Sequence, residues 1–583
     1  MAAPVPSVTP SRTSGRVPLG VFFDATGTTD ADVNAFRDLY YQWSFGDSGA
    51  GTWEYGANTA MPKNGATGPM AGHVYETAGT YQWSNLVYDG TTAIITVGTI
   101  TASDWPNDAN TVCIGNTLPV AGVNGVPSNA TCVASSDFDA AVAANIGTNK
   151  RLLFNRVDTF PSSAAAVLTT TGPAMIGGYG AGTAPLITSS SISGVIRLST
   201  AAADIRIGKL EITGAGAADT GAAITIEAAA VSDITILEPV IHNIGKGIIV
   251  TGSGENALVD SVIQGASIYD IQAASGGVGI FGKFVTTAIL GNSVGPFATA
   301  AEHNIRVQPG QKVVVSNNTA TTPGDTGKCC LTIRAGEHST AGDPDPVYDT
   351  QYVYFSDNKL IYPRGGAVGA QPLEISPAST SQNNWISDVI GERNIVQARA
   401  SAATSSEGAK VSASRVTLRN NLFDMSGSPS GMTGVSVQYT NVAGAPVPDD
   451  VRILNNTMYA GTSAGSFVGV DIDTEPTATV VNNNIAYAPS SVSRDMISGT
   501  GTSPGSLTNN SSDAQVLTDP LFTGPLTSPQ GFRFATTSYA QNAGTALFPT
   551  GYADFYNADD VTANVAIGAF VPRVRASSKG VAA

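Results

Sequence analysis

Short apolar runs separated by Gly, Asn and Ser dominate the chain from about residue 152 onward. VIRLS (195–199), AITIE (223–227) and GIIVT (247–251) are typical of many such runs. Runs of this length, rich in β-branched residues and bounded by turn residues, predict strands. Helical periodicity is scarce, and a doubly wound α/β fold would need interleaved helices of about ten residues or more. The pattern therefore predicts a chain built from stacked strands.

Six runs in the second half end in asparagine. They are KVVVSNN, VYFSDN, IGERN, VTLRNN, VRILNN and TVVNNN, and their last asparagines are 40, 36, 27, 35 and 28 residues apart. Asparagine tolerates a left-handed turn, and identical amide side chains stacked on parallel strands form hydrogen-bonded ladders. The spacing predicts a right-handed parallel β-helix of roughly ten coils, since solenoid coils repeat in this way. The residues assigned this structural role are Asn318, Asn358, Asn394, Asn421, Asn456 and Asn484.

Residues 1–100 have a different pattern, with short alternating strands and turn clusters at the spacing of a β-sandwich. The pieces YQWSFGD (41–47) and HVYETAGTY (73–81) contain W-x-F-G-D and H-x-Y-x-x-x-G-x-Y in order. They resemble the immunoglobulin-like domain of the polycystic-kidney-disease (PKD) type. That resemblance implies a spacer or adhesion module without catalysis. Trp53 and Tyr55 are aromatic residues that could stack on a sugar if exposed.

Residues 101–150 read as a connector. Phe138, Ala141, Val142 and Ile146 have the spacing of a short amphipathic helix, which we expect to cover the open end of the first coil. Cys113 and Cys132 bracket a Gly/Pro/Asn-rich loop, and they either close a disulfide or remain free.

The C-terminal stretch contains DPLF (519–522), GFRF (531–534), SYAQNAGT (538–545) and AIGAF (566–570) in order. These pieces resemble the closing segment of bacterial and viral right-handed β-helix proteins, a group that includes phage tailspikes and pectate-lyase-like enzymes. The resemblance implies the fold but not an activity, because this fold hosts lyases, hydrolases, epimerases and binding proteins. We therefore expect an all-β chain with a sandwich at 1–100, a connector at 101–150, a β-helix at 151–515 and a closing segment at 516–583.

Charged residues make up only 13% of the 583 residues, and the net charge is −16. The acidity argues against nucleic acid or an anionic membrane as partner. No run reaches the roughly 20 apolar residues of a membrane helix. The N-terminal MAAPVPSVTPSR lacks the apolar core of a signal peptide, so either a signal was removed or the protein leaves its cell by another route, such as lysis that releases a virus particle.

One outward strip carries the candidate chemistry. Aligning Ile305, Ile333, Ile375, Val437 and Ile472 as inward residues puts their neighbours outside. The strip then holds the candidate catalytic pair Glu302 and Glu374 and the candidate carbohydrate-binding residues Arg306 and Arg334. The carboxylates either neutralise the arginines or form the acid and base of a glycosidase, with the arginines gripping an acidic sugar.

The loop after this strip, GEHSTAGDPDPVYDT, is rich in polar residues. Glu337 and His338 are further candidates for carbohydrate binding, and Asp343 and Asp345 for a Ca²⁺ site, although their spacing matches no EF-hand. No other cofactor is indicated. His303 lies at an inward position of its strand and is expected to be a core histidine.

These observations predict an extracellular or virion-surface protein that binds cell-surface polysaccharide, of the phage tailspike, fibre or head-decoration kind. A polysaccharide depolymerase and a secreted bacterial adhesin are the alternatives. We expect the N-terminal domain to contact other virion or surface proteins. Tailspike analogy suggests a homotrimer, without a coiled-coil heptad to support it.

Overall fold

The computed structural model describes most of the chain up to Ser498 and isolated stretches beyond it. Within 2–498 it leaves out 190–191, 217–218, 252–255, 274–275, 325–327, 337–347, 364–370, 378–384, 399–404, 427–430, 440–446, 462–464 and 490–492. Beyond 498 it describes 499, 501, 505–508, 510, 519–522, 526, 532 and 538.

The N-terminal part is a sandwich of two sheets. One sheet has the order β1-β3-β6 and the other β2-β8-β7-β4-β5. Their bounds are β1 (Thr9–Pro10), β2 (Ser14–Arg16), β3 (Leu19–Asp24), β4 (Tyr40–Ser44), β5 (Gly65–Thr67), β6 (Met70–Tyr75), β7 (Gly79–Tyr88) and β8 (Ala93–Ser103), with the short helix α1 (Ala35–Asp38) before β4. Trp43 and Phe45 pack between the sheets, as their alternation predicts. The assignment to the PKD type stays a prediction.

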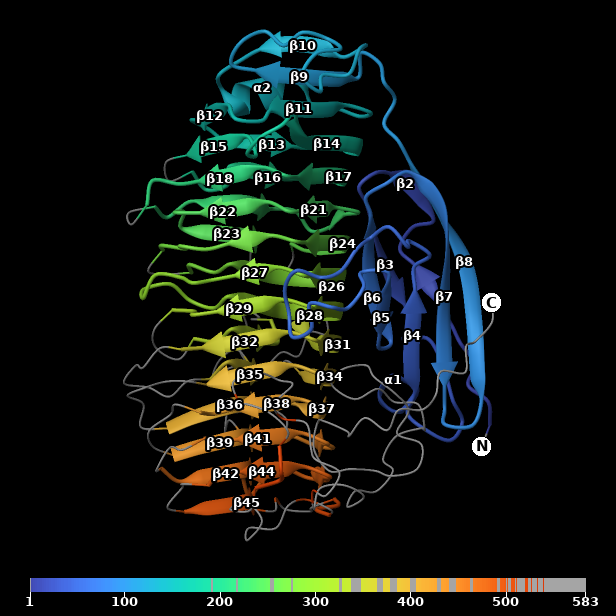
Figure 1. Ribbon diagram of the computed structural model, residues 1–583, viewed down its shortest axis with the longest axis vertical. Coiled ribbons are helices and arrows are strands. Elements are labelled where there is room, and N and C mark those ends of the chain that lie inside the picture. Colours follow the sequence, from blue (N-terminus) through green and yellow to red (C-terminus); the bar gives the residue numbers. More distant parts are fainter. Residues whose placement is uncertain are drawn as a thin grey trace.

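The rest of the described chain is a right-handed parallel β-helix, which confirms the predicted fold class (Figure 1). Three parallel sheets run along it, and we call them the first, second and third sheet in the order in which each coil meets them. The first sheet contains β13 (Ala166–Leu168), β16 (Ile196–Leu198), β19 (Ala222–Ile226), β23 (Lys246–Val250), β30 (Leu331–Ile333), β33 (Leu373–Ile375), β36 (Ser405–Val411), β39 (Gly431–Val437), β42 (Phe467–Ile472) and β45 (Arg494–Ser498).

The second sheet follows after a corner. It contains β9 (Thr111–Gly115), β10 (Thr131–Ala134), β11 (Arg151–Asn155), β14 (Thr171–Tyr179), β17 (Ala203–Gly208), β20 (Val231–Ser232), β21 (Thr235–Leu237), β24 (Leu258–Gln264), β31 (Thr350–Ser356), β34 (Ile386–Glu392), β37 (Ser414–Arg419), β40 (Arg452–Leu454) and β43 (Val480–Asn482). Two long strands continue through the corner and belong to both sheets, β26 (Ile280–Leu290) and β28 (Ile305–Ser316).

The third sheet closes each coil. It contains β12 (Thr159–Ser162), β15 (Leu186–Ser189), β18 (Glu211–Thr213), β22 (Val240–His242), β25 (Ser267–Ile268), β27 (Ser293–Val294), β29 (Thr319–Thr321), β32 (Lys359–Tyr362), β35 (Ile395–Ala398), β38 (Leu422–Asp424), β41 (Thr457–Tyr459) and β44 (Ile485–Tyr487). Inward aliphatic residues such as Ile187, Ile212, Ile241 and Ile268 stack through successive strands and are fully buried.

A ladder of buried asparagines runs along the corner between the second and third sheets. Each amide Nδ2 donates to the Oδ1 of the next asparagine, at 2.8–3.0 Å, and each backbone N–H donates to the same Oδ1. The ladder includes all six asparagines marked in the sequence, and it extends them by one residue at either end, Asn292 and Asn510. It therefore satisfies backbone groups that a buried corner would otherwise leave unpaired.

The left-handed residue of this corner is the one before each ladder asparagine. Positive φ values belong to the preceding positions, Asn317, Asp357, Arg393, Asn420, Asn455 and Asn483. Four of these six residues are asparagines, which tolerate the left-handed conformation. The role of the ladder asparagines is hydrogen bonding, and the turn is made one residue earlier.

Helix α2 (Phe138–Asn145) lies at the end of the β-helix where β9, β10 and β11 begin the stack (Figure 1). Asp137 caps it by accepting from the Ala140 N–H at 2.9 Å. Phe138, Ala141 and Val142 are buried against the first coils, so the predicted capping helix is present.

The sandwich lies lengthwise against the second sheet (Figure 1). Phe22, Met70 and Val74 are not part of the sandwich core. They form one apolar cluster with second-sheet residues such as Leu290 and Val314. Each face of β3 and β6 is therefore buried, one inside the sandwich and one against the β-helix. The sandwich is packed along the β-helix and does not project from its end.

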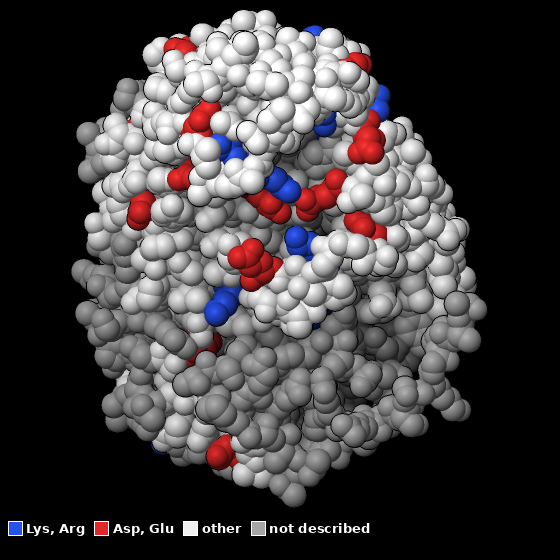
Figure 2. All heavy atoms as spheres, turned by 45° about the horizontal axis from the view of Figure 1, so that its top comes forward, with Lys and Arg blue, Asp and Glu red and all other residues white. Residues whose placement is uncertain are grey.

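Ion pairs flank this apolar contact. Arg12 bonds Asp204 at 2.5 Å, and Lys312 bonds Asp24 at 2.6 Å. Figure 2 shows the same tendency on one face of the molecule, where acidic and basic side chains lie next to each other on a largely uncharged surface. Opposite charges in contact hold the two parts in register more than they add stability.

A buried charge network lies at the same contact. Arg393 donates to both oxygens of Asp357, at 3.1 and 3.0 Å, and it also bonds Glu392. Arg419 donates to the second oxygen of Glu392 at 2.6 Å. Arg393 also donates to the Thr67 hydroxyl of the sandwich, so the network joins both parts of the chain.

Candidate functional site

The outward row of the first sheet runs through Phe281, Arg306, Thr332, Glu374, Lys410, Ser436 and Asp471, which are opposite one another on successive strands. The predicted alignment is correct from Ile333 to Ile375. It is wrong at Arg306, because Val307, and not Ile305, is opposite Ile333. Arg306 therefore lies beside Thr332, one row away from Arg334.

The sequence alignment also missed β36, which inserts Lys410 between Glu374 and Ser436. Its inward residues are Ala409 and Val411, opposite Leu373 and Ile375 of β33, and the small Ala409 stands where the neighbouring strands have leucine or valine. Asn394 and Asn421 mark successive coils, and each coil passes through the first sheet. The 27 residues between them therefore indicate a first-sheet strand.

Glu374 lies in a buried ion pair. Its carboxylate accepts from Arg334 at 2.6 Å, from the Thr332 hydroxyl at 2.9 Å and from the Ser376 hydroxyl at 2.9 Å. Burial alone would raise its pKa, but the Arg334 charge and these hydrogen bonds lower the pKa of Glu374 to about 2. A carboxyl group with that pKa is ionised at neutral pH and cannot serve as a general acid, so this geometry favours the neutralising role over the catalytic one.

Glu302 occupies a more accessible place. Its carboxylate is 3.6 Å from Arg306 and 3.9 Å from Lys328, and it accepts from the Gly276 N–H at 3.2 Å. The Arg306 guanidinium lies over the Phe281 ring, 5.0 Å from its centroid. The four side chains Phe281, Glu302, Arg306 and Lys328 form what we call the Arg306 cluster. It offers an aromatic ring, two cations and a carboxylate on adjacent coils, which suits a polar ligand with hydroxyl or acidic groups.

His303 is a core residue, as its inward position predicts. It is buried, and its Nδ1 accepts from the Cys329 N–H at 2.9 Å. Burial, and next the charge of Arg334, hold the pKa of His303 well below its usual value. The imidazole is thus neutral and accepts a hydrogen bond from the backbone.

The polar loop lies outside the described residues, which include neither Glu337 and His338 nor Asp343 and Asp345. Among the residues that the structure does describe, no group of three or more His, Cys, Asp or Glu side chains could hold a metal ion. No described helix is long and apolar enough to cross a membrane.

All four cysteines are free thiols, so the bridge between Cys113 and Cys132 is not formed. The two residues nevertheless lie directly opposite each other on β9 and β10. Burial, and next the neighbouring Cys132, raise the pKa of the Cys113 thiol to about 12. A thiol in that state is an inert packing group.

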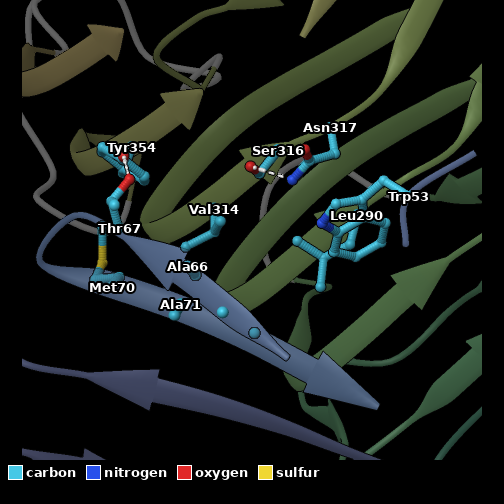
Figure 3. A pocket seen from close by; sticks show the side chains of 12 residues that line it. Trp53, Ala66, Thr67, Met70, Ala71, Leu290, Val314, Ser316, Asn317 and Tyr354 are labelled. Atoms are coloured by element: carbon cyan, nitrogen blue, oxygen red, sulfur yellow. Dashed lines mark hydrogen bonds between the residues drawn. The ribbon is translucent and has the colours of Figure 1, made fainter. Parts of the chain in front are cut away.

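Trp53 is not available to stack on a sugar, because it is buried between the sandwich and the β-helix. It lines a cavity of about 20 Å³ together with Met70, Leu290, Val314 and Tyr354 (Figure 3). Ligand sites enclose hundreds of cubic ångströms, whereas a space of this size suits one water molecule. This cavity is a packing feature of the contact.

Comparisons with known proteins found solved structures of low sequence identity. No family model matches the sequence, and no curated protein matches it. The A-module of a mannuronan C-5 epimerase from Azotobacter vinelandii has 16% identity and a TM-score of 0.39, over 61% of this chain and 93% of that one. The Dettilon tailspike protein has 11% identity and a TM-score of 0.38, over 59% and 60%. A family 28 exopolygalacturonase from Yersinia enterocolitica has 10% identity and a TM-score of 0.35, over 87% and 100%.

Proposed function

We propose that this chain is a virion-surface or extracellular protein that binds cell-surface polysaccharide on the first sheet of its β-helix. The Arg306 cluster carries the proposal, because it combines an aromatic ring, two cations and a carboxylate on adjacent coils. The sandwich covers the second sheet, and Phe522 and Phe532 pack against tyrosines of the third sheet. The Arg306 cluster lies on the first sheet, where Phe281, Arg306, Lys410 and Asp471 keep part of their surface exposed, and this is the face that we propose for a long polymer.

Binding is tested with bacterial capsular and O-antigen polysaccharides, both neutral and uronate-containing, on an array and by calorimetry. We expect Phe281→Ala and Arg306→Gln each to weaken binding by about tenfold, because the first removes the ring that holds Arg306 in place and the second removes a charged donor to the ligand, each a loss of roughly 1–2 kcal/mol. Arg197→Gln is the matched control, since Arg197 lies on the same outward row, is paired with Glu227, and precedes the cluster by several strands. Unchanged affinity in both cluster variants would contradict the proposed site.

The alternative function is a depolymerase, and Glu302 favours it because, of the two candidate catalytic carboxylates, it is the one outside the buried Arg334 pair. If the protein cleaves the glycan that it binds, reducing ends accumulate with time. Glu302→Gln should then lower that rate by about 100-fold or more, as expected for loss of a general acid or base, while binding persists. Binding without release of reducing ends, across the glycans bound, rules the depolymerase out. The secreted adhesin differs from the virion protein in origin and shares the same binding test.

A further inference from the structure

Strand β8 forms an edge of the outer sheet of the sandwich. The sheet order is β2-β8-β7-β4-β5, and β2 pairs only with Thr101, Ala102 and Ser103 at the end of β8. Within the described part of the chain, the residues from 93 to 100 pair with β7 on one side and with no strand on the other. Figure 1 shows β8 on the side of the sandwich away from the β-helix.

Along residues 93 to 100, the backbone N–H and C=O groups of every second residue point away from β7. The Thr101 N–H donates to Thr13 O at 2.9 Å, and Ser103 O accepts from the Val17 N–H at 3.0 Å, both on the side away from β7. The β7–β8 register is unbroken from Ala93 to Ala102. The backbone N–H and C=O groups of successive residues in an antiparallel strand point to opposite sides. Those of Ile95, Val97 and Thr99 therefore also point away from β7, at the free edge of the sheet.

The side chains at these positions are exposed, and those of Ile95 and Val97 are apolar. Ile95 is 62% exposed and Val97 is 59% exposed, and Leu86 lies opposite Ile95 on β7. Neither β7 nor β8 contains a charged residue. Edge strands are ordinarily protected by lysine, proline or a bulge, and residues 93 to 100 have none of these.

We propose that two copies of this chain pair through β8, antiparallel about a two-fold axis, to give one continuous sheet. Val97 then faces Val97 of the second copy, Ile95 faces Thr99, and the outward N–H and C=O groups of each copy meet those of the other. The strand is complementary to itself in backbone direction and in side-chain type, as an isologous contact requires. Two chains of net charge −16 repel each other over most of their surfaces, and the uncharged β7–β8 face lets them approach.

The full chain is tested by sedimentation velocity and light scattering from about 1 to about 50 µM, because dimerisation follows mass action. We expect a mass twice the 59.3 kDa of one chain. Val97→Lys should raise the dissociation constant by about 100-fold or more. Val97→Pro should do the same, since it removes an N–H that points away from β7 and leaves the sandwich ladder intact. Val167→Lys, at an exposed valine of β13, is the control and should remain dimeric.

Hydrogen exchange of the Ile95 and Val97 amides provides a second readout that needs no variant, and it should slow as the concentration rises. If Val97→Lys does not fold, the proline variant and this exchange decide. A wild-type chain that stays monomeric at about 50 µM overturns the proposal. A dimer or trimer whose mass survives both Val97 substitutions overturns it as well.

Discussion

Asn394→Asp is expected to lower the free energy of unfolding by about 3–5 kcal/mol, because it places a carboxylate in the middle of a buried ladder. The wild-type Nδ2 donates to the Asn421 Oδ1 at 3.0 Å and to the Phe355 carbonyl at 3.3 Å. An aspartate oxygen at that position faces two acceptors and repels both. Its other oxygen still accepts from the Asn358 side chain and backbone, so the loss comes from one half of the amide.

Chemical denaturation followed by circular dichroism measures this effect, with hydrogen exchange to localise it. Asn394→Ala should cost about 2–4 kcal/mol, since it leaves buried donors of Asn358 without their acceptor. Asn116→Ala is the control, an exposed asparagine whose removal should change stability by about 0.5 kcal/mol or less. Equal stability of Asn394→Asp and the wild type would show that the ladder does not stabilise the corner.

The ladder was predictable because one residue type recurs at one place in each coil, and stacking makes such recurrence visible in a single sequence. The register of the outward strip was less predictable. Ile305 and Val307 are both inward residues of β28, so sequence alone gives no reason to prefer the pairing of Val307 with Ile333. The burial of Glu374 depends on Arg334, Thr332 and Ser376 meeting it in space, which no spacing along the chain encodes.

The sequence of β3 indicates that the sandwich packs against another layer, although simple alternation of polar and apolar residues does not show it. LGVFFD in β3 has Phe22 and Phe23 in succession, which point to opposite faces of the strand, and both are buried. A strand of a free two-sheet sandwich has one solvated face. Two apolar faces therefore indicate a third layer, and that layer is the β-helix.

Arg393→Ala is expected to cost about 3–5 kcal/mol, since removing one partner of a buried ion pair leaves the other charge uncompensated. Arg393 is 1% exposed and holds both oxygens of Asp357. Glu392 keeps Arg419 as a partner in the variant, whereas Asp357 loses both of its Arg393 hydrogen bonds. The loss should also loosen the sandwich, because the same guanidinium bonds Thr67.

Arg415→Ala is a closely matched control for this prediction. Arg415 also has a positive φ and also donates twice to one aspartate, Asp388, at 2.8 and 2.8 Å, but its side chain is 43% exposed. Because water screens the exposed Arg415 and Asp388 keeps its hydrogen bonds from Gln351 and Ser387, this variant should lose about 1 kcal/mol or less. Denaturant titrations of the two variants measure the difference, and hydrogen exchange in β5 and β6 reports whether the sandwich has loosened. Similar losses in both would mean that burial adds nothing to the Arg393 pair.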